Sequence, residues 1–183
     1  MNKVVFIGAG PGDPELITLK GKRYLEQADV VIYAGSLLNP EYLKYAKPSA
    51  KLYDSAKMSL PEVLKVMVEA VKADKLVARV HDGDPSFYGA IQEQMDALDK
   101  EKIEYFRVPG VSCLQGGAGA LNRELTLPNI SVISLPLFSD GNPHWPLLYP
   151  NTTFALNFGT KSILKFEVRQ TGPIMGIEEI GIS

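Results

Sequence analysis

The stretch Val4-Val5-Phe6-Ile7-Gly8-Ala9-Gly10-Pro11-Gly12-Asp13-Pro14 decides the fold of this chain. Its four apolar residues, bounded by glycine, predict a buried parallel strand. The glycines predict a tight turn, because glycine has no side chain and accepts positive φ. Asp13 is a natural N-cap and Pro14 a natural first helical residue. We therefore expect strand, glycine loop and helix, and open α/β sheets bind ligands at such loops.

The same loop does not fit the dinucleotide-binding fingerprint G-x-G-x-x-G. Counted from Gly8, the third glycine would fall at position 13, where the chain has Asp13. Pro11 also lacks the backbone N–H that would donate to a pyrophosphate. This stretch therefore disfavours a nicotinamide-dependent oxidoreductase.

Composition narrows the class of protein. The 183 residues, 45% of them hydrophobic, suffice for one large domain or two small ones. A net charge of −2 gives no broad attraction to nucleic acid. The one cysteine excludes an internal disulfide and a four-cysteine zinc site. No apolar run reaches the roughly 18 residues of a membrane span, and no signal peptide precedes the first strand. We expect a cytoplasmic α/β protein that holds no metal and binds neither membrane nor nucleic acid.

Strands and helices alternate along the first two thirds of the chain. Strands are predicted at 28–33, 51–53, 75–80 and 103–108. Helices are predicted at 16–27, 41–46 and 112–121, and from Ser59, which forms a capping box with Glu62. This alternation predicts a mainly parallel sheet with helices on both faces.

A second Gly-Asp-Pro, at 83–85, repeats the arrangement of 12–14. We expect Asp84 to cap a helix that Pro85 enters and that carries Phe87, Ile91 and Met95 on one face. Two helix caps of about 1 kcal/mol each explain the repeat without any ligand. Two copies at equivalent strand ends also predict a shared cleft whose backbone groups and carboxylates hold polar groups of a ligand.

The chain changes character near position 127, where prolines become frequent. Strands are predicted at 130–135 and 152–158 and a helix at 161–168, whereas 171–183 shows no clear period. We place an N-terminal α/β domain at 1–127 and a partial C-terminal α/β domain at 128–183. The second is short for a complete domain.

The glycine loop, Gly35-Ser36-Leu37 and the segment 79–90 together resemble the tetrapyrrole (corrin/porphyrin) methyltransferases. The resemblance implies a two-domain α/β fold, with the active site between the domains and S-adenosylmethionine (SAM) as methyl donor. Four further segments resemble the branch that methylates precorrin-4 or cobalt-precorrin-4 at C11 in cobalamin biosynthesis: 33–37, 88–94, 109–111 and 124–128. It also implies S-adenosylhomocysteine as product, and a homodimer.

The resemblance assigns residues to two binding roles. It implies contacts with the methyl donor from Pro11, Asp82, Gly83, Asp84, Phe87, Ser112, Cys113 and Phe158. It implies a border of the tetrapyrrole pocket at Gly8, Gly10, Gly12 and Asp13. It assigns no catalytic residue. The related uroporphyrinogen methyltransferases have a carboxylate where this chain has Ala34, which favours the C11 branch.

The remaining polar residues have ordinary interpretations. His81 is expected to be structural or solvated, and Cys113 to be a small residue of a pocket wall. Four cations are expected to be surface charges, although a tetrapyrrole's carboxylates offer partners to one or two of them: Lys20, Arg23, Arg79 and Arg123.

Two further functions stay open from the sequence. One is a methylase of the same fold with another substrate, either a different tetrapyrrole or the substrates of diphthine or ribosomal-RNA methylases. The other is a non-catalytic corrinoid-binding remnant, which the short second part favours.

Overall fold

The computed structural model describes residues 2–87, 89–124, 152–157, 163–170 and 175–182, with side chains as far as 124. The chain divides into two compact units, Met1–Cys113 and Leu114–Ser183. The predicted boundary at 127/128 lies outside the described residues and stays a prediction.

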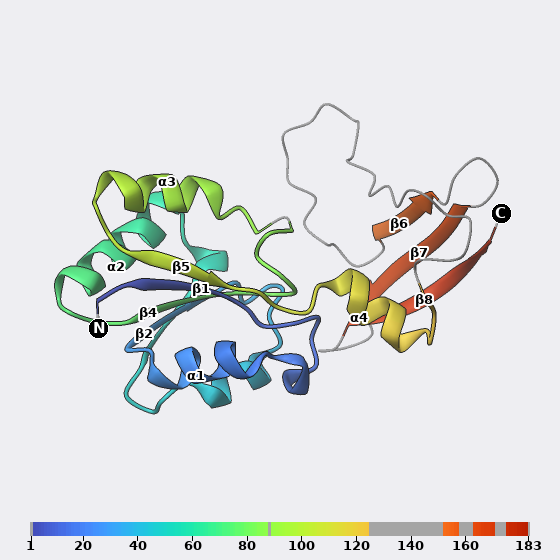
Figure 1. Cartoon of the computed structure of the whole chain (residues 1–183), viewed down its shortest axis with the longest axis horizontal. Helices are drawn as coiled ribbons and strands as arrows, with labels where there is room; N and C mark the ends of the chain where they lie inside the picture. The colour runs from blue at the N-terminus through green and yellow to red at the C-terminus, as the bar shows by residue number, and fades with distance from the viewer. Residues whose placement is uncertain (1, 88, 125–151, 158–162, 171–174, 183) are drawn as a thin grey trace. The chain divides into compact units, whose positions relative to one another are not determined.

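A five-stranded parallel sheet forms the centre of the first unit (Figure 1). The strands are β1 (Val4–Gly8), β2 (Val30–Tyr33), β3 (Lys51–Asp54), β4 (Val77–His81) and β5 (Tyr105–Val108). Their order is β3-β2-β4-β1-β5. Val4 pairs with Val77 on one side and with Tyr105 on the other, so β1 is a central strand. The predicted parallel sheet is confirmed.

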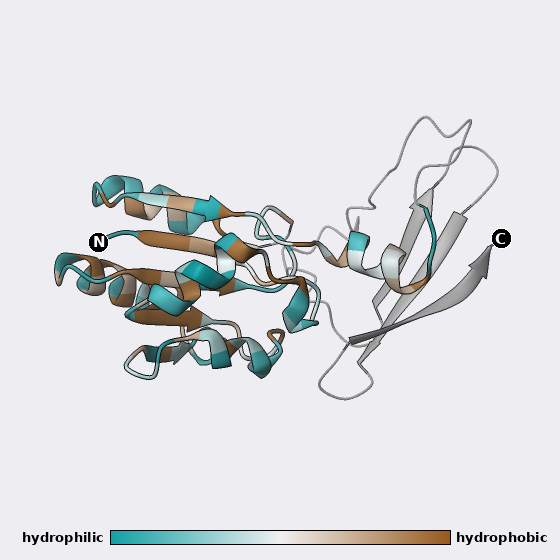
Figure 2. Ribbon diagram, turned by 60° about the horizontal axis from the view of Figure 1, so that its bottom comes forward, coloured by the Kyte–Doolittle hydropathy of each residue, from teal (hydrophilic) through white to brown (hydrophobic). Residues whose placement is uncertain are grey.

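Helices cover both faces of this sheet, as predicted (Figure 1). Helices α2 (Leu60–Lys72) and α3 (Gln92–Lys100) pack on the face that carries Phe6 and Ile32. Helix α1 (Leu19–Gln27) and the 3₁₀ helix η2 (Pro40–Tyr45) pack on the face that carries Ile7 and Val31. Figure 2 shows hydrophobic colours along the strands, between helices with hydrophilic outer turns. The strands are therefore buried on both sides, as expected for a parallel sheet.

Local signals placed some helix starts correctly and misplaced others. The predicted capping box at Ser59 is confirmed, with the Ser59 N–H donating to Glu62 Oε2 at 2.7 Å. The helix expected at 16–27 begins later, because Asp13 caps only the 3₁₀ helix Pro14–Leu16 and Ile17 is extended. Thr18 then caps α1 by accepting from the Gly21 N–H at 3.1 Å.

The second unit contains a three-stranded antiparallel sheet in the order β6-β7-β8. Its strands are β6 (Thr152–Asn157), β7 (Ile163–Gln170) and β8 (Met175–Ile182), and helix α4 (Cys113–Ala120) precedes them in the chain. The strand expected from 152 is confirmed through 157. The helix expected at 161–168 is wrong, because apolar and charged residues alternate with period two along β7. The strand expected at 130–135 lies outside the described residues.

Candidate functional site

Four loops follow the carboxyl ends of β1, β2, β4 and β5. They comprise residues 9–13, 34–39, 82–91 and 109–112. Because the strands are parallel, these ends share one edge of the sheet, which is where open α/β sheets bind ligands. The predicted donor and pocket residues of the first unit all fall on these loops, apart from Gly8, which ends β1, and Cys113, which begins α4.

Three glycines lie close together at this edge of the sheet. A Cβ on Gly8 would lie 2.6 Å from the Gly110 nitrogen and 2.7 Å from the Gly83 carbonyl oxygen. A Cβ on Gly110 would likewise overlap the Gly83 carbonyl oxygen. The loops after β1, β4 and β5 can therefore approach only as bare backbone. We call Gly8, Gly83 and Gly110 the glycine junction.

Backbone hydrogen bonds join two of these loops. The Gly10 N–H donates to the Gly83 carbonyl at 3.2 Å, and the Gly83 N–H donates to the Gly10 carbonyl at 2.8 Å. Gly10 has φ +95° and Gly83 has φ +57°, both in the region that favours glycine. The loop that leads to the first Gly-Asp-Pro is thus paired with the first residue of the second.

Asp84 links the β4 loop to the β5 loop. Its Oδ1 accepts from the Ser86 N–H at 2.8 Å, and its Oδ2 accepts from the Gly110 N–H at 2.9 Å. The helix expected to begin at Pro85 is absent, since residues 84–87 form a turn and α3 begins only at Gln92. Ala90 has φ +47°, which interrupts any helical path from Pro85. Phe87 accordingly lies outside α3 and is 50% exposed.

The carboxyl edge of the sheet presents its polar groups differently from the sequence prediction. Pro14 opens a 3₁₀ helix of three residues and Pro85 opens a turn, so neither starts the α-helix that the sequence predicted. The loops themselves, rather than two helix N-termini, supply the backbone N–H groups at this edge.

Buried side chains hold the β1 loop from beneath, which the sequence did not predict. Asn39 Nδ2 donates to the Gly12 carbonyl at 2.8 Å, and the Tyr42 hydroxyl donates to the Asp13 carbonyl at 2.8 Å. Burial raises the pKa of Tyr42 to about 12, and the nearby Asp13 adds to this shift. The Asn-Pro at 39–40 signals a local cap, and Asn39 Oδ1 does accept from the Glu41 N–H. Nothing local signals contacts with residues 27 to 29 positions away.

The β2 loop is held by the end of β3. Asp54 Oδ1 accepts from the Gly35 N–H at 2.9 Å and from the Ala56 N–H at 3.0 Å. These two donors lower the pKa of Asp54. A Cβ on Gly35 would lie 2.6 Å from Asp54 Oδ2, so a larger residue there would displace this carboxylate. The Gly35-Ser36-Leu37 segment is thus a fixed part of the edge.

Asp82 follows β4 directly and is half-buried. Burial raises the pKa of its carboxyl group, while its own backbone N–H opposes that shift. The charge of Asp82 also contributes to the raised pKa of Tyr42. The chain therefore has an acidic residue directly before Gly83 of the glycine junction.

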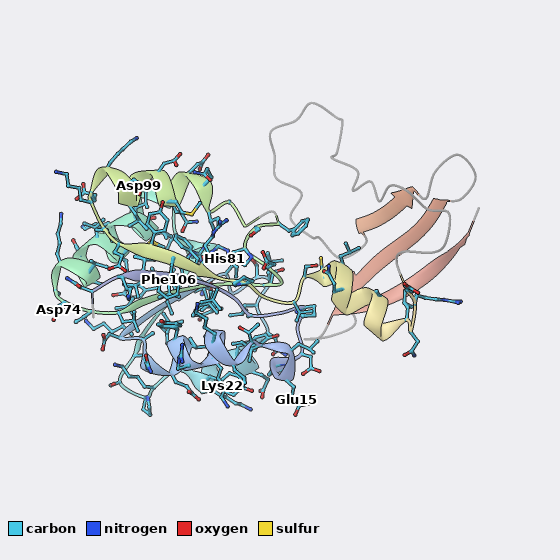
Figure 3. The ribbon with its side chains drawn as sticks, viewed as in Figure 1. Glu15, Lys22, Asp74, His81, Asp99 and Phe106 are labelled. Atoms are coloured by element: carbon cyan, nitrogen blue, oxygen red, sulfur yellow. The ribbon has the colours of Figure 1, made fainter. Side chains whose placement is uncertain are left out.

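Arg79 differs from its expected place, whereas His81 takes one of the two roles expected of it. Arg79 was expected at the surface but is only 7% exposed, and burial lowers its pKa to about 10. His81 is structural rather than solvated: it is 6% exposed, and burial followed by the charge of Arg79 holds its pKa well below 6.5. Figure 3 shows His81 among the strands, whereas Asp74 and Asp99 lie at the periphery.

The structure brings some of the residues predicted to bind the methyl donor close together. A Cβ on Gly83 would lie 3.5 Å from the Cys113 nitrogen and 3.7 Å from the Ser112 Cα, so the segments of these three residues are adjacent. Ser112 is buried and Cys113 is half-buried. Phe158 lies outside the described residues. Gly8 and Gly10 are buried, whereas Gly12 and Asp13 are more open to solvent.

Two other kinds of site are absent from the described part of the chain. It contains no group of three or more His, Cys, Asp or Glu residues that could hold a metal ion. None of its helices is both long enough and apolar enough to cross a membrane.

Comparison with known proteins identifies the family. The model of the family "Tetrapyrrole (Corrin/Porphyrin) Methylases" matches residues 3–158, which is most of the chain. The chain belongs to the tetrapyrrole methylases. The expected family and fold class are thereby confirmed.

Named relatives within this family share the first part of the chain. A cobalt-precorrin-4 C(11)-methyltransferase of Methanocaldococcus jannaschii is 56% identical over 129 residues, 70% of this chain and 50% of the relative. A precorrin-4 C(11)-methyltransferase of Pseudomonas aeruginosa is 45% identical over 128 residues, 70% of this chain and 51% of the relative. The chain therefore spans about half the length of the curated relatives it matches.

Solved tetrapyrrole methylases have the same fold. The X-ray structure of a cobalt-precorrin-4 methyltransferase, described as a cobalamin biosynthetic enzyme, aligns with TM-score 0.78 and 34% identity over 96% of this chain and 84% of that one. A uroporphyrin-III C-methyltransferase of Thermus thermophilus, solved with S-adenosylhomocysteine, aligns with TM-score 0.58 and 32% identity over 70% of this chain and 52% of that one.

Proposed function

We propose that this chain is part or all of a SAM-dependent C-methyltransferase that methylates precorrin-4 or cobalt-precorrin-4 at C11 in cobalamin biosynthesis. The observation that carries the proposal is the glycine junction, where three loops meet as bare backbone at the ligand-binding edge of the sheet. The 56% identity to a relative named for this reaction supports the choice of substrate. The protein would act in the cytoplasm as a homodimer, without nucleic acid or membrane.

The residues at this edge fit a ligand such as SAM. A Cβ on Gly12 would meet nothing within 4 Å, so there is room beside the β1 loop. The carboxylates of Asp82 and Asp84 suit the cationic and hydroxyl groups of the donor, and the half-exposed ring of Phe87 offers an apolar contact. We propose that seven described residues hold the donor: Pro11, Asp82, Gly83, Asp84, Phe87, Ser112 and Cys113. Phe158 stays an expectation of the resemblance.

The tetrapyrrole would lie against the β1 loop, at Gly10, Gly12 and Asp13. Gly8 is enclosed in the glycine junction, so its role there is to leave room for backbone rather than to touch substrate. Asn39 and Tyr42 hold this loop from beneath, which fixes its position before any ligand binds.

Methyl transfer from a sulfonium to carbon neutralises the positive charge of the donor. Its rate therefore depends mainly on how well the two reactants are aligned. When bound, SAM supplies an activated methyl group. The chain contributes fixed loops, held by Asp54, Asp84 and Tyr42, that orient the reactants and exclude water. Well-oriented reactants lower a barrier by up to about 7–11 kcal/mol. No strong base is demanded by such a step, although a proton must leave the product.

Mass spectrometry of reaction mixtures tests the proposal. The purified chain is incubated with SAM and, separately, with precorrin-4, cobalt-precorrin-4 and uroporphyrinogen III. Addition of one methyl group to a precorrin-4 form supports the proposal. Methylation of uroporphyrinogen alone supports the alternative of another tetrapyrrole substrate. SAM binding without any product supports the non-catalytic alternative.

A further inference from the structure

Arg79 is a buried cation whose described partners are all neutral. Its Nε donates to Gln94 Oε1 at 3.3 Å, and its Nη1 donates to the Ile32 carbonyl at 3.4 Å. Among the described residues no carboxylate forms an ion pair with it, and burial is the cause of its lowered pKa. A buried charge without a counter-charge is costly, so its presence calls for an explanation.

His81 lies two residues further along β4, on the same face of the sheet. Its Nε2 is buried and has no hydrogen-bond partner among the described residues. The ring lies beside Phe6, with centroids 6.2 Å apart, and its low pKa keeps it neutral. A neutral imidazole has one N–H to donate. Two under-used donors, the Arg79 guanidinium and the His81 ring, are therefore neighbours.

Both groups lie close to the proposed donor site. The Arg79 guanidinium reaches across to β2 at Ile32, two residues before the β2 loop begins at Ala34. His81 ends β4 and directly precedes Asp82 and Gly83. Ala34 has no carboxylate that could neutralise Arg79 at this point.

We propose that Arg79 and His81 form a receptor for a carboxylate that a bound ligand brings to this edge. The guanidinium would donate two parallel N–H bonds and His81 Nε2 a third, in the tautomer that carries its proton there. The inference rests on the proposed function, whose two ligands both carry carboxylates: the amino-acid part of SAM and the side chains of the tetrapyrrole. The ligand then supplies the counter-charge that the fold lacks.

Paired binding measurements test this receptor. The full chain is prepared as wild type, as Arg79→Met and as Arg107→Met, a control that removes an exposed arginine from the parallel strand β5. Dissociation constants are measured for S-adenosylhomocysteine, for methylthioadenosine (which lacks the amino-acid carboxylate) and for uroporphyrin, a stable tetrapyrrole with carboxylate side chains. Urea unfolding is measured on the same samples.

We expect Arg79→Met to weaken binding of one carboxylate ligand at least tenfold, while Arg107→Met binds as wild type does. Weaker binding of S-adenosylhomocysteine, with methylthioadenosine unchanged, assigns the carboxylate to the donor. Weaker binding of uroporphyrin alone assigns it to the tetrapyrrole. We also expect Arg79→Met to unfold at or above the wild-type urea midpoint, since apolar replacement of a buried charge is often neutral or stabilising.

If Arg79→Met binds all three ligands as tightly as the wild type does, the receptor is overturned and the proposed function stays intact. Failure of the wild-type chain to bind any ligand overturns both. If Arg79→Met does not fold, His81→Phe decides, because it removes one donor and leaves the cation in place. A several-fold loss of affinity for a carboxylate ligand then supports the receptor, and unchanged affinity for all three ligands overturns it.

Discussion

Replacing Asp84 by alanine tests whether one carboxylate holds two loops of the site together. Asp84→Ala removes the acceptors of the Ser86 and Gly110 N–H groups, at 2.8 and 2.9 Å. A hydrogen bond to a charged group contributes about 1.5–3 kcal/mol. The Ser86 N–H is exposed and regains water, so we expect a total loss of about 2–3 kcal/mol. At about 2–4 °C per kcal/mol for a chain of this size, the melting temperature should fall by roughly 4–12 °C.

Urea unfolding and calorimetric titration with S-adenosylhomocysteine measure the two consequences. We expect lower stability together with weaker binding, because the β4 and β5 loops then lose their connection. Asp96→Ala is the matched control, since the bond that Asp96 accepts within the described part of the chain comes from the exposed Gln92 side chain of α3. If Asp84→Ala unfolds within about 0.5 kcal/mol of Asp96→Ala, the proposed bracing of the loops is refuted. Normal affinity in a destabilised Asp84→Ala would refute its link to the donor site.

Three further predictions concern the glycine junction and the buried ionisable groups. Gly8→Ala should lower stability by about 1–3 kcal/mol or more, because the new Cβ overlaps Gly110 and Gly83. Gly119→Ala is the control and should not lower stability, because its new Cβ has nothing within 4 Å. The urea midpoints of the two variants are compared. The pKa of folded His81 is depressed, so only the unfolded chain gains this proton below pH 6.5. As pH falls below 6.5, the free energy of unfolding of the wild type should therefore fall by up to about 1.4 kcal/mol per pH unit relative to that of His81→Phe. Urea unfolding at several pH values measures this difference. The pKa of folded Asp82 is raised, so the folded chain keeps this proton to higher pH than the unfolded chain. Asp82→Asn should be more stable than wild type at pH 7, with a gain that vanishes below pH 3.8, and equal stability at pH 7 would contradict this.

The sequence was sufficient for the elements whose signals are local and repeated. The apolar run at 4–7 and the alternation of strands and helices predicted the parallel sheet, and Ser59 with Glu62 predicted the start of α2. The second Gly-Asp-Pro misled, because Asp84 and Pro85 favour a turn as readily as a helix start. The residues after Pro85 decide between the two, and the positive φ of Ala90 ends any helical path.

The supports of the site depend on contacts between distant parts of the chain. Asn39, Tyr42 and Asp54 hold loops that lie 19 to 29 residues away, which no local pattern encodes. The burial of Arg79, by contrast, could have been predicted from the sequence. Since 75–80 was predicted as a strand of a sheet covered on both faces, an arginine within it had to be buried.

Nuclear magnetic resonance of the ¹⁵N-labelled chain tests the central claim most directly, which is that the glycine junction lines a methyl-donor site. On addition of S-adenosylhomocysteine, the account predicts shifts at the backbone amides of Gly10, Gly83 and Gly110–Cys113, with the amides of α2 unchanged. No shift at these amides at about 1 mM ligand, which corresponds to binding weaker than about −4.1 kcal/mol, would contradict the account. Shifts confined to other parts of the chain would contradict it equally.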